Sequence, residues 1–199
     1  MDRDRRVLFF GDSFVAGVGD PTGLGWVGRA VAAAHDAGRP LTAYNLGVRR
    51  DTSADVAARW ECEARARMRA ADASYGVVFG LGTNDMTLQD GALRVEAWRA
   101  ADNLGRLIDG ARAAGLDVFV VGPPPAGEPA QDERILRLSE RFAGVAAGSA
   151  VPFVETAATL CVCAAWTSEA ARVDGSHPGA RGYDVLAGLV LAGGWLEWL

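Results

Sequence analysis

Five short apolar runs alternate with longer segments rich in alanine and arginine, and this alternation constrains the fold more than any other feature. The runs lie at 6–10, 42–47, 76–81, 117–122 and 151–154. Apolar residues at helical spacing predict helices at 24–37, 53–71, 94–114, 131–148 and 180–192, and a further short helix near 155–165. Runs without a polar face are typical of parallel strands covered on both sides. The pattern therefore predicts an α/β protein with a five-stranded parallel sheet.

Length and charge bound the organisation of the chain and its partners. A chain of 199 residues buries roughly 70% of the surface that its unfolded form exposes, and no linker or repeat divides it, so one domain over 1–199 is expected. The net charge is −5 and the basic residues, all arginine, are dispersed, which argues against nucleic acid as a partner. No apolar segment approaches the roughly 20 residues of a membrane span, and no secretory leader pattern precedes the first strand.

The cysteines indicate a reducing compartment. Cys62, Cys161 and Cys163 are an odd number, and the Cys-x-Cys pair is too close for an easy disulfide. We therefore expect a cytoplasmic protein. No second Cys or His pair accompanies Cys161 and Cys163, so we expect buried apolar side chains there rather than half of a metal site.

Ligands of such sheets bind beyond the carboxyl ends of the strands, so the residues that follow each strand are expected to lie close together. These segments are Gly11-Asp12-Ser13, Asn45-Leu46-Gly47, Gly82-Thr83-Asn84-Asp85, Gly122-Pro123-Pro124-Pro125 and, before the last helix, Asp174-Gly175-Ser176-His177-Pro178.

Only two histidines are available as a general base. His35 comes late in the first predicted helix, where histidines are commonly solvated or stabilised by the helix dipole. His177 lies in a loop three residues after Asp174, so one turn can bring the carboxylate to Nδ1 and leave Nε2 for a serine. A serine hydroxyl needs such a base to become a nucleophile. The pattern predicts a catalytic triad of Ser13, His177 and Asp174.

Acyl transfer also needs hydrogen-bond donors for the oxyanion of the tetrahedral intermediate. The candidates are the backbone N–H of Ser13, the backbone N–H of Gly47, which no Cβ obstructs, and the side-chain amide of Asn84. Gly47 and Asn84 also have ordinary interpretations as turn or capping residues. Their position after successive strands favours the catalytic one.

Together these motifs resemble the SGNH/GDSL hydrolases, a family of esterases and lipases named for Ser, Gly, Asn and His in four sequence blocks. The matching blocks are GDSFVAG with Ser13, NLG with Gly47, GLGTND with Asn84 and DGSHPGARGY with Asp174 and His177, in the expected order between residues 7 and 183. The resemblance implies a flavodoxin-like three-layer α/β/α fold, a Ser-His-Asp triad, and an oxyanion hole formed by Ser13 N–H, Gly47 N–H and Asn84 Nδ2. It also implies hydrolysis of a small-molecule ester without a metal or an organic cofactor.

One departure concerns the second block, where family members often have another glycine and this chain has Val48-Arg49-Arg50. If Arg49 and Arg50 face the pocket, an anionic substrate group is favoured; otherwise they are solvated charges at a helix start. Short-chain acyl esters, with thioesters close behind, are the expected substrates. Trp26, Met86 and their neighbours outline either a modest apolar acyl pocket or part of the core.

Other functions stay open at this point. The acyl group could pass to another acceptor in an acyltransferase, or the enzyme could deacetylate a carbohydrate or another small metabolite. A non-catalytic ligand-binding module is a further alternative. An α/β-hydrolase requires G-x-S-x-G, but Val15 stands where the second glycine belongs. A dinuclear metallophosphoesterase would generally recruit more than one histidine.

Overall fold

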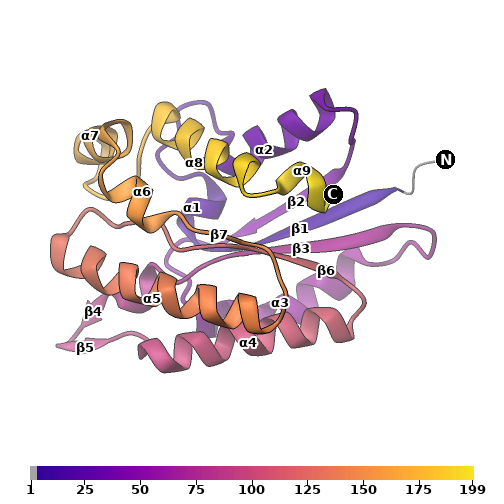
Figure 1. The fold of residues 1–199 in the computed structure, drawn as a ribbon, viewed down its shortest axis with the longest axis horizontal. Coiled ribbons are helices and arrows are strands. Elements are labelled where there is room, and N and C mark those ends of the chain that lie inside the picture. The colour runs from indigo at the N-terminus through magenta and orange to yellow at the C-terminus, as the bar shows by residue number, and fades with distance from the viewer. Residues whose placement is uncertain (1–3) are drawn as a thin grey trace.

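The five apolar runs form the central sheet of a three-layer α/β/α arrangement in the computed structural model, which describes residues 4–199 (Figure 1). The strands are all parallel, in the order β2-β1-β3-β6-β7. Their bounds are Arg5–Gly11 for β1, Thr42–Gly47 for β2, Ser74–Gly80 for β3, Asp117–Val121 for β6 and Phe153–Val154 for β7. Residues 1–3 of the predicted domain lie outside the described residues.

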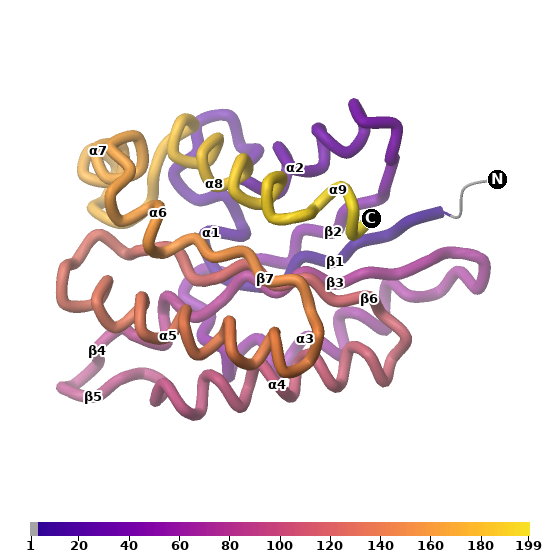
Figure 2. Tube along the Cα trace, in the orientation of Figure 1, coloured from indigo at the N-terminus to yellow at the C-terminus, as the bar shows by residue number. Residues whose placement is uncertain are grey.

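Helices cover both faces of the sheet. On one face lie α2 (Gly25–Asp36), α8 (Ala180–Ala192) and α9 (Trp195–Trp198), and on the other lie α3 (Ser53–Arg67), α4 (Ala97–Ala113) and α5 (Pro129–Gly148). Figure 2 shows that α2 and α8 run side by side although most of the chain separates them. Short elements gather at one end: α1 (Ser13–Ala16), η1 (Asn84–Met86), β4 (Leu88–Gln89), β5 (Ala92–Leu93), α6 (Ala157–Cys161) and α7 (Ala164–Val173).

Strand β1 shows why the apolar runs lack a polar face. Leu8 and Phe10 pack into the core beneath α3 and α4, whereas Val7 and Phe9 pack into the core beneath α2 and α8. All four side chains are fully buried. Burial of each such side chain contributes about 1.5–3 kcal/mol, so β1 stabilises both layers at once.

The structure confirms all five predicted strands and the five long helices, with shifted ends. Helix α3 ends at Arg67 instead of 71, because the backbone N–H and C=O of Ala70 bond to the Tyr75 hydroxyl (2.9 and 3.0 Å). The short helix predicted near 155–165 is confirmed as α6, whereas α7, which follows it, was not predicted. The chain turns at Val162 to give α6 and α7, and this turn lets Trp166 pack against Tyr183 of α8.

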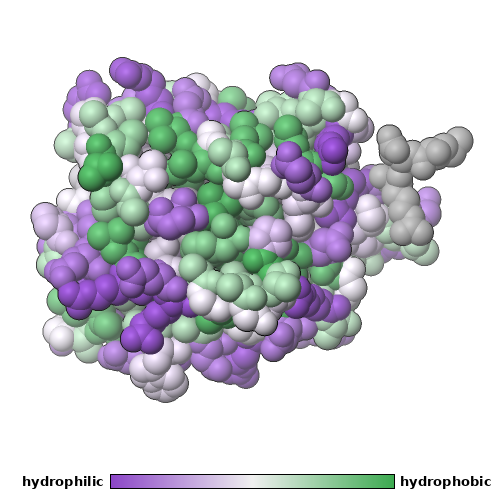
Figure 3. Space-filling view, in the orientation of Figure 1, coloured by the Kyte–Doolittle hydropathy of each residue, from purple (hydrophilic) through white to green (hydrophobic). Residues whose placement is uncertain are grey.

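The prediction that the Cys-x-Cys pair is buried is wrong. Cys161 and Cys163 flank that turn and are only half-buried, while Cys62 is exposed on α3. No helix within residues 4–199 combines the length and apolar character that crossing a membrane requires. Figure 3 shows hydrophilic side chains gathered over the outer side of α5, where Glu133 and Arg137 form an ion pair one helical turn apart.

Candidate active site

The site begins at the sharp turn from β1 into α1. Asp12 is extended and its carboxylate accepts the Phe14 N–H (2.9 Å), so it caps a helix whose first residue is Ser13. Gly11, before the turn, has no room for a side chain, because a Cβ there would lie 1.8 Å from the Gly80 carbonyl oxygen of β3. The turn therefore places Ser13 at the carboxyl edge of the sheet, with a backbone N–H that has no intrahelical partner.

The loop between α7 and α8 carries the histidine and its carboxylate. Asp174 Oδ1 accepts the backbone N–H groups of Ser176 (3.0 Å) and His177 (2.8 Å), while Oδ2 lies 2.7 Å from His177 Nδ1. Burial raises the pKa of Asp174, but the hydrogen bonds from His177 and Ser176 outweigh it and bring the pKa to about 2. The carboxylate is thus ionised and can only accept, which assigns the ring proton to Nδ1.

The other ring nitrogen reaches the serine. His177 Nε2 lies 2.8 Å from Ser13 Oγ, although the two residues are 164 positions apart. The Phe14 ring, 5.0 Å from the imidazole between centroids, packs against His177 and is itself stacked on Trp166. The structure therefore brings the three predicted triad residues into one hydrogen-bonded chain. His35 instead bonds to the backbone of Leu41 near the end of α2.

Asn84 opens η1 in the segment that follows β3 and lines the same cavity as Ser13. Its Nδ2 donates to Asp12 Oδ2 (3.2 Å) and to the carbonyl oxygen of Asp51 (3.1 Å). Both amide hydrogens are therefore engaged, and a substrate oxyanion would have to replace one of these acceptors.

Gly47 lies beside the turn that carries Ser13, where a Cβ would come within 2.4 Å of Ala16 N and 2.8 Å of the Asp12 carbonyl oxygen. Its N–H donates to Asn45 Oδ1 (3.1 Å), and the Asn45 amide in turn donates to the Val15 carbonyl (2.8 Å). A side chain at position 47 would push α1 away from the sheet. The glycine is needed for this close approach, whatever its N–H does in catalysis.

Two carboxylates beside Asn84, Asp12 and Asp85, are buried, and their positions in the segments after β1 and β3 did not indicate this burial. Burial raises the pKa of Asp12 to about 7 and that of Asp85 to about 6. Asp85 accepts hydrogen bonds from the backbone N–H and the hydroxyl of Ser53 at the start of α3, and Asn103 of α4 donates to that hydroxyl (2.9 Å). This network joins η1 to α3 and α4. The only sequence signal was the acidic residue directly after Asn84, since its partners are distant in the chain.

The candidate catalytic cavity, which Ser13 and His177 line, is small, about 220 Å³. Most of its lining residues are of polar type; they are Ser13, Phe14, Arg49, Arg50, Thr83, Asn84, Thr87, Ala126, Gln131, Ser176 and His177. The two arginines thus lie at the cavity. The sequence left two alternatives for Trp26, Met86 and their neighbours. The structure places Trp26, Val27 and Met86 in the core, at most 2% exposed. Thr87 lines the cavity, whereas Leu24 and Leu88 are exposed. Within residues 4–199, no three His, Cys, Asp or Glu side chains cluster as a metal site would require.

A serine bonded to an imidazole that is oriented by a carboxylate, at the carboxyl edge of a parallel α/β/α sheet, defines the class of protein: a serine hydrolase. The sequence comparison specifies the family. Residues 9–185 match the model of the GDSL-like lipase/acylhydrolase family. The chain belongs to this family, and its enzyme class is carboxylic ester hydrolase.

Solved structures share the fold over nearly the whole chain. The lipase/acylhydrolase from Enterococcus faecalis is 22% identical, with a TM-score of 0.77, and the match covers 97% of this chain and 96% of that one. Axe2, an acetylxylan esterase from Geobacillus stearothermophilus, is 19% identical, with a TM-score of 0.75 and coverage of 100% and 99%. A G-D-S-L family protein from Veillonella parvula is 19% identical, with a TM-score of 0.71 and coverage of 94% and 97%. Among curated proteins, no sequence matches this chain.

Proposed function

We propose that this enzyme hydrolyses short-chain acyl esters through an acyl-enzyme on Ser13, with His177 as the general base and Asp174 as the residue that orients it. The observation that carries the proposal is the 2.8 Å contact between His177 Nε2 and Ser13 Oγ. This distance is within the range in which an imidazole can take the hydroxyl proton.

The chemistry then follows from the positions of the protons. Nε2 accepts the Ser13 proton as Oγ attacks the ester carbonyl, and the resulting imidazolium is stabilised by the Asp174 carboxylate 2.7 Å from Nδ1. Nε2 next protonates the leaving alcohol, which departs as the acyl-enzyme forms. A water molecule repeats the sequence: it gives its proton to Nε2, attacks the acyl carbonyl, and releases the acid and free Ser13.

The proposed oxyanion donors are the N–H groups of Ser13 and Gly47 and the amide of Asn84. In the unliganded protein the Asn84 amide bonds to Asp12 and Asp51, and the Gly47 N–H bonds to Asn45. Catalytic hydrogen bonds commonly form only when the substrate is bound. The oxyanion, a stronger acceptor than the Asp51 carbonyl, would take one hydrogen of the Asn84 amide.

The size of the cavity supports a short acyl group. Pockets that enclose drug-sized ligands are about 300–1,000 Å³, and the catalytic cavity is about 220 Å³. We expect kcat/KM for p-nitrophenyl esters to be highest at acetate to butyrate and to fall with chain length. A maximum at dodecanoate or longer would contradict the short-chain assignment.

The mechanism is tested by covalent labelling of the intact protein with a fluorophosphonate and mapping of the adduct by mass spectrometry. We expect one adduct, on Ser13, and complete loss of esterase activity. Ser13→Ala should abolish both labelling and turnover, whereas Ser168→Ala, the same change on the exposed side of α7, should retain both. Full activity in Ser13→Ala, or an adduct on another residue, would rule out the proposed nucleophile.

Deacetylation of a carbohydrate is the second candidate. Two observations favour it: the small acyl cavity, and the fold shared with a protein described as an acetylxylan esterase. Release of acetate from acetylated xylo-oligosaccharides, compared with p-nitrophenyl acetate as the reference ester, distinguishes this candidate. Ethyl acetate, whose leaving alcohol is not activated, is included as a second reference, and if acetylated sugars react no faster than ethyl acetate, the sugar is not recognised. Transfer of the acyl group to an added sugar, rather than to water, would indicate an acyltransferase.

A further inference from the structure

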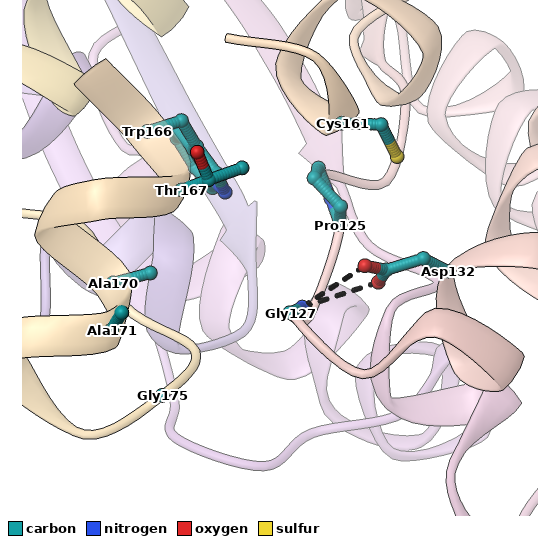
Figure 4. A pocket seen from close by; sticks show the side chains of 9 residues that line it. All are labelled: Pro125, Gly127, Asp132, Cys161, Trp166, Thr167, Ala170, Ala171 and Gly175. Carbon is teal, nitrogen blue, oxygen red and sulfur yellow. Dashed lines mark hydrogen bonds between the residues drawn. The ribbon is translucent and has the colours of Figure 1, made fainter. Parts of the chain in front are cut away.

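A second, larger cavity of about 420 Å³ lies beside the catalytic cavity, between α7 on one side and α6, the start of α5 and the loop after β6 on the other (Figure 4). Its lining residues are Pro125, Gly127, Asp132, Cys161, Trp166, Thr167, Ala170, Ala171 and Gly175. The volume is in the range of small-molecule sites. No step of the proposed ester hydrolysis uses this cavity.

The two cavities share a wall. Gly127 and Gly175 meet backbone to backbone, and a Cβ on Gly127 would lie 2.2 Å from the Gly175 carbonyl oxygen. Their neighbours Ala126 and Ser176 line the catalytic cavity, and Gly175 directly follows Asp174. A ligand in the larger cavity would therefore touch the same loop that holds Asp174 and His177.

A residue in the wall of the cavity has a buried hydrogen-bond donor without a partner among the described residues. In Figure 4 the Trp166 side chain extends from α7 toward the cavity. Its indole N–H has no hydrogen-bond partner within the described part of the chain, although the residue is only 1% exposed. A buried donor without a partner costs about 1–3 kcal/mol. An acceptor atom on a ligand would remove this cost.

An acceptor lies on the opposite side. The Asp132 carboxylate takes hydrogen bonds from the backbone N–H groups of Ala126 (2.6 Å) and Gly127 (3.2 Å). An ionised carboxylate has about four acceptor positions, so these contacts leave capacity for a donor from a ligand. Pro125, Ala170 and Ala171 supply apolar surface between the polar groups.

This combination selects the chemistry of the ligand. An anion would be repelled by Asp132, and an ammonium group would offer only donors to the indole N–H of Trp166. A hydroxyl group can donate to the carboxylate and accept from the indole. We propose that this cavity is a binding site for a neutral polyhydroxylated ring, such as a single sugar unit, that contacts Trp166 and Asp132 beside the catalytic loop.

The test is a titration of the ¹⁵N-labelled protein, with the indole N–H signal of Trp166 assigned by its absence in Trp166→Phe. Methyl β-xylopyranoside is the neutral ring, and cyclohexylamine and cyclohexanecarboxylate are its cationic and anionic counterparts. We expect the glycoside to shift the Trp166 signal saturably, with a Kd on the order of 1–10 mM, as suits a small ligand with few hydrogen bonds. The two charged rings should produce no saturable shift.

Ala171 is an exposed residue of α7 that lines the cavity. The larger side chain in Ala171→Leu should occupy part of the cavity and weaken glycoside binding at least tenfold. Ala164→Leu makes the same change at an exposed residue of α7 outside the cavity and should leave binding unchanged. Absence of a saturable shift, an equal response to cyclohexylamine, or unaltered binding in Ala171→Leu would each overturn the proposal. Because the readout is binding, its failure is distinct from any failure of Ser13 to act as a nucleophile.

Discussion

Asp174→Asn tests the catalytic geometry most directly, because the hydrogen bonds of the carboxylate determine how the amide must sit. Oδ1 accepts two backbone N–H groups, from Ser176 and His177, whereas Oδ2 faces only His177 Nδ1. In the variant the amide oxygen must remain at the Oδ1 position, since an NH₂ group there would meet two donors. The NH₂ group is then directed at Nδ1.

An NH₂ group at that position donates to Nδ1 and moves the ring proton to Nε2. Nε2 then faces the Ser13 hydroxyl as a donor and cannot accept its proton. The same inversion of the histidine tautomer in a serine protease lowers kcat about 10⁴-fold, which corresponds to about 5 kcal/mol in the activation barrier. We expect a loss of this size in kcat for p-nitrophenyl acetate, with little change in KM.

The assay compares kcat with the rate of fluorophosphonate labelling, which also requires a deprotonated Ser13. Both rates should fall by a similar factor in Asp174→Asn. The control is Asp36→Asn, the same change on an exposed carboxylate at the end of α2, and it should retain full activity. A loss smaller than tenfold in Asp174→Asn would refute the role assigned to this carboxylate.

Three other predictions follow from the described contacts. Asn84→Ala should raise the activation barrier by about 2.7–4 kcal/mol, seen as a lower kcat with an unchanged KM. A change in KM with an unchanged kcat would show that Asn84 is not part of the oxyanion hole. Arg49→Ala and Arg50→Ala should lower kcat/KM for esters with a carboxylate in the acyl chain relative to neutral esters. An unchanged ratio of the two kcat/KM values would mean that the arginines are solvated charges that do not contact the substrate. Asp20 is buried, which raises its pKa, but Arg29 and nearby hydrogen bonds outweigh this and lower it from 3.8 to about 2. Its ionised form should thus contribute about 2 kcal/mol of stability above pH 4 that is lost toward pH 2. Urea unfolding of Asp20→Asn and the parent chain should show their difference shrinking over that interval, and a constant difference would contradict it.

Much of the architecture was predictable because strand and helix patterns are local. Short apolar runs such as 7–10, which alternate with long segments of helical period, favour strands of a sheet covered on both sides. The order of the four sequence blocks indicated the family that the comparison then showed. The hairpin β4–β5 and the break between α6 and α7 were missed. Strands β4 and β5 have two residues each and α6 has five, which is too short for a periodic signal in the sequence. Packing determines where such elements begin and end.

The sequence by itself determined which side chains were available for chemistry: one serine after the first strand, one histidine in a loop, and a carboxylate three residues before it. Only the tertiary structure decided that these groups touch, because the 2.8 Å contact joins residues 164 positions apart. It also decided the surroundings of Asn84, the buried state of Trp26 and Met86, and the cavity beside the catalytic loop. Such features depend on how distant segments pack together, and no local pattern records the distance between them.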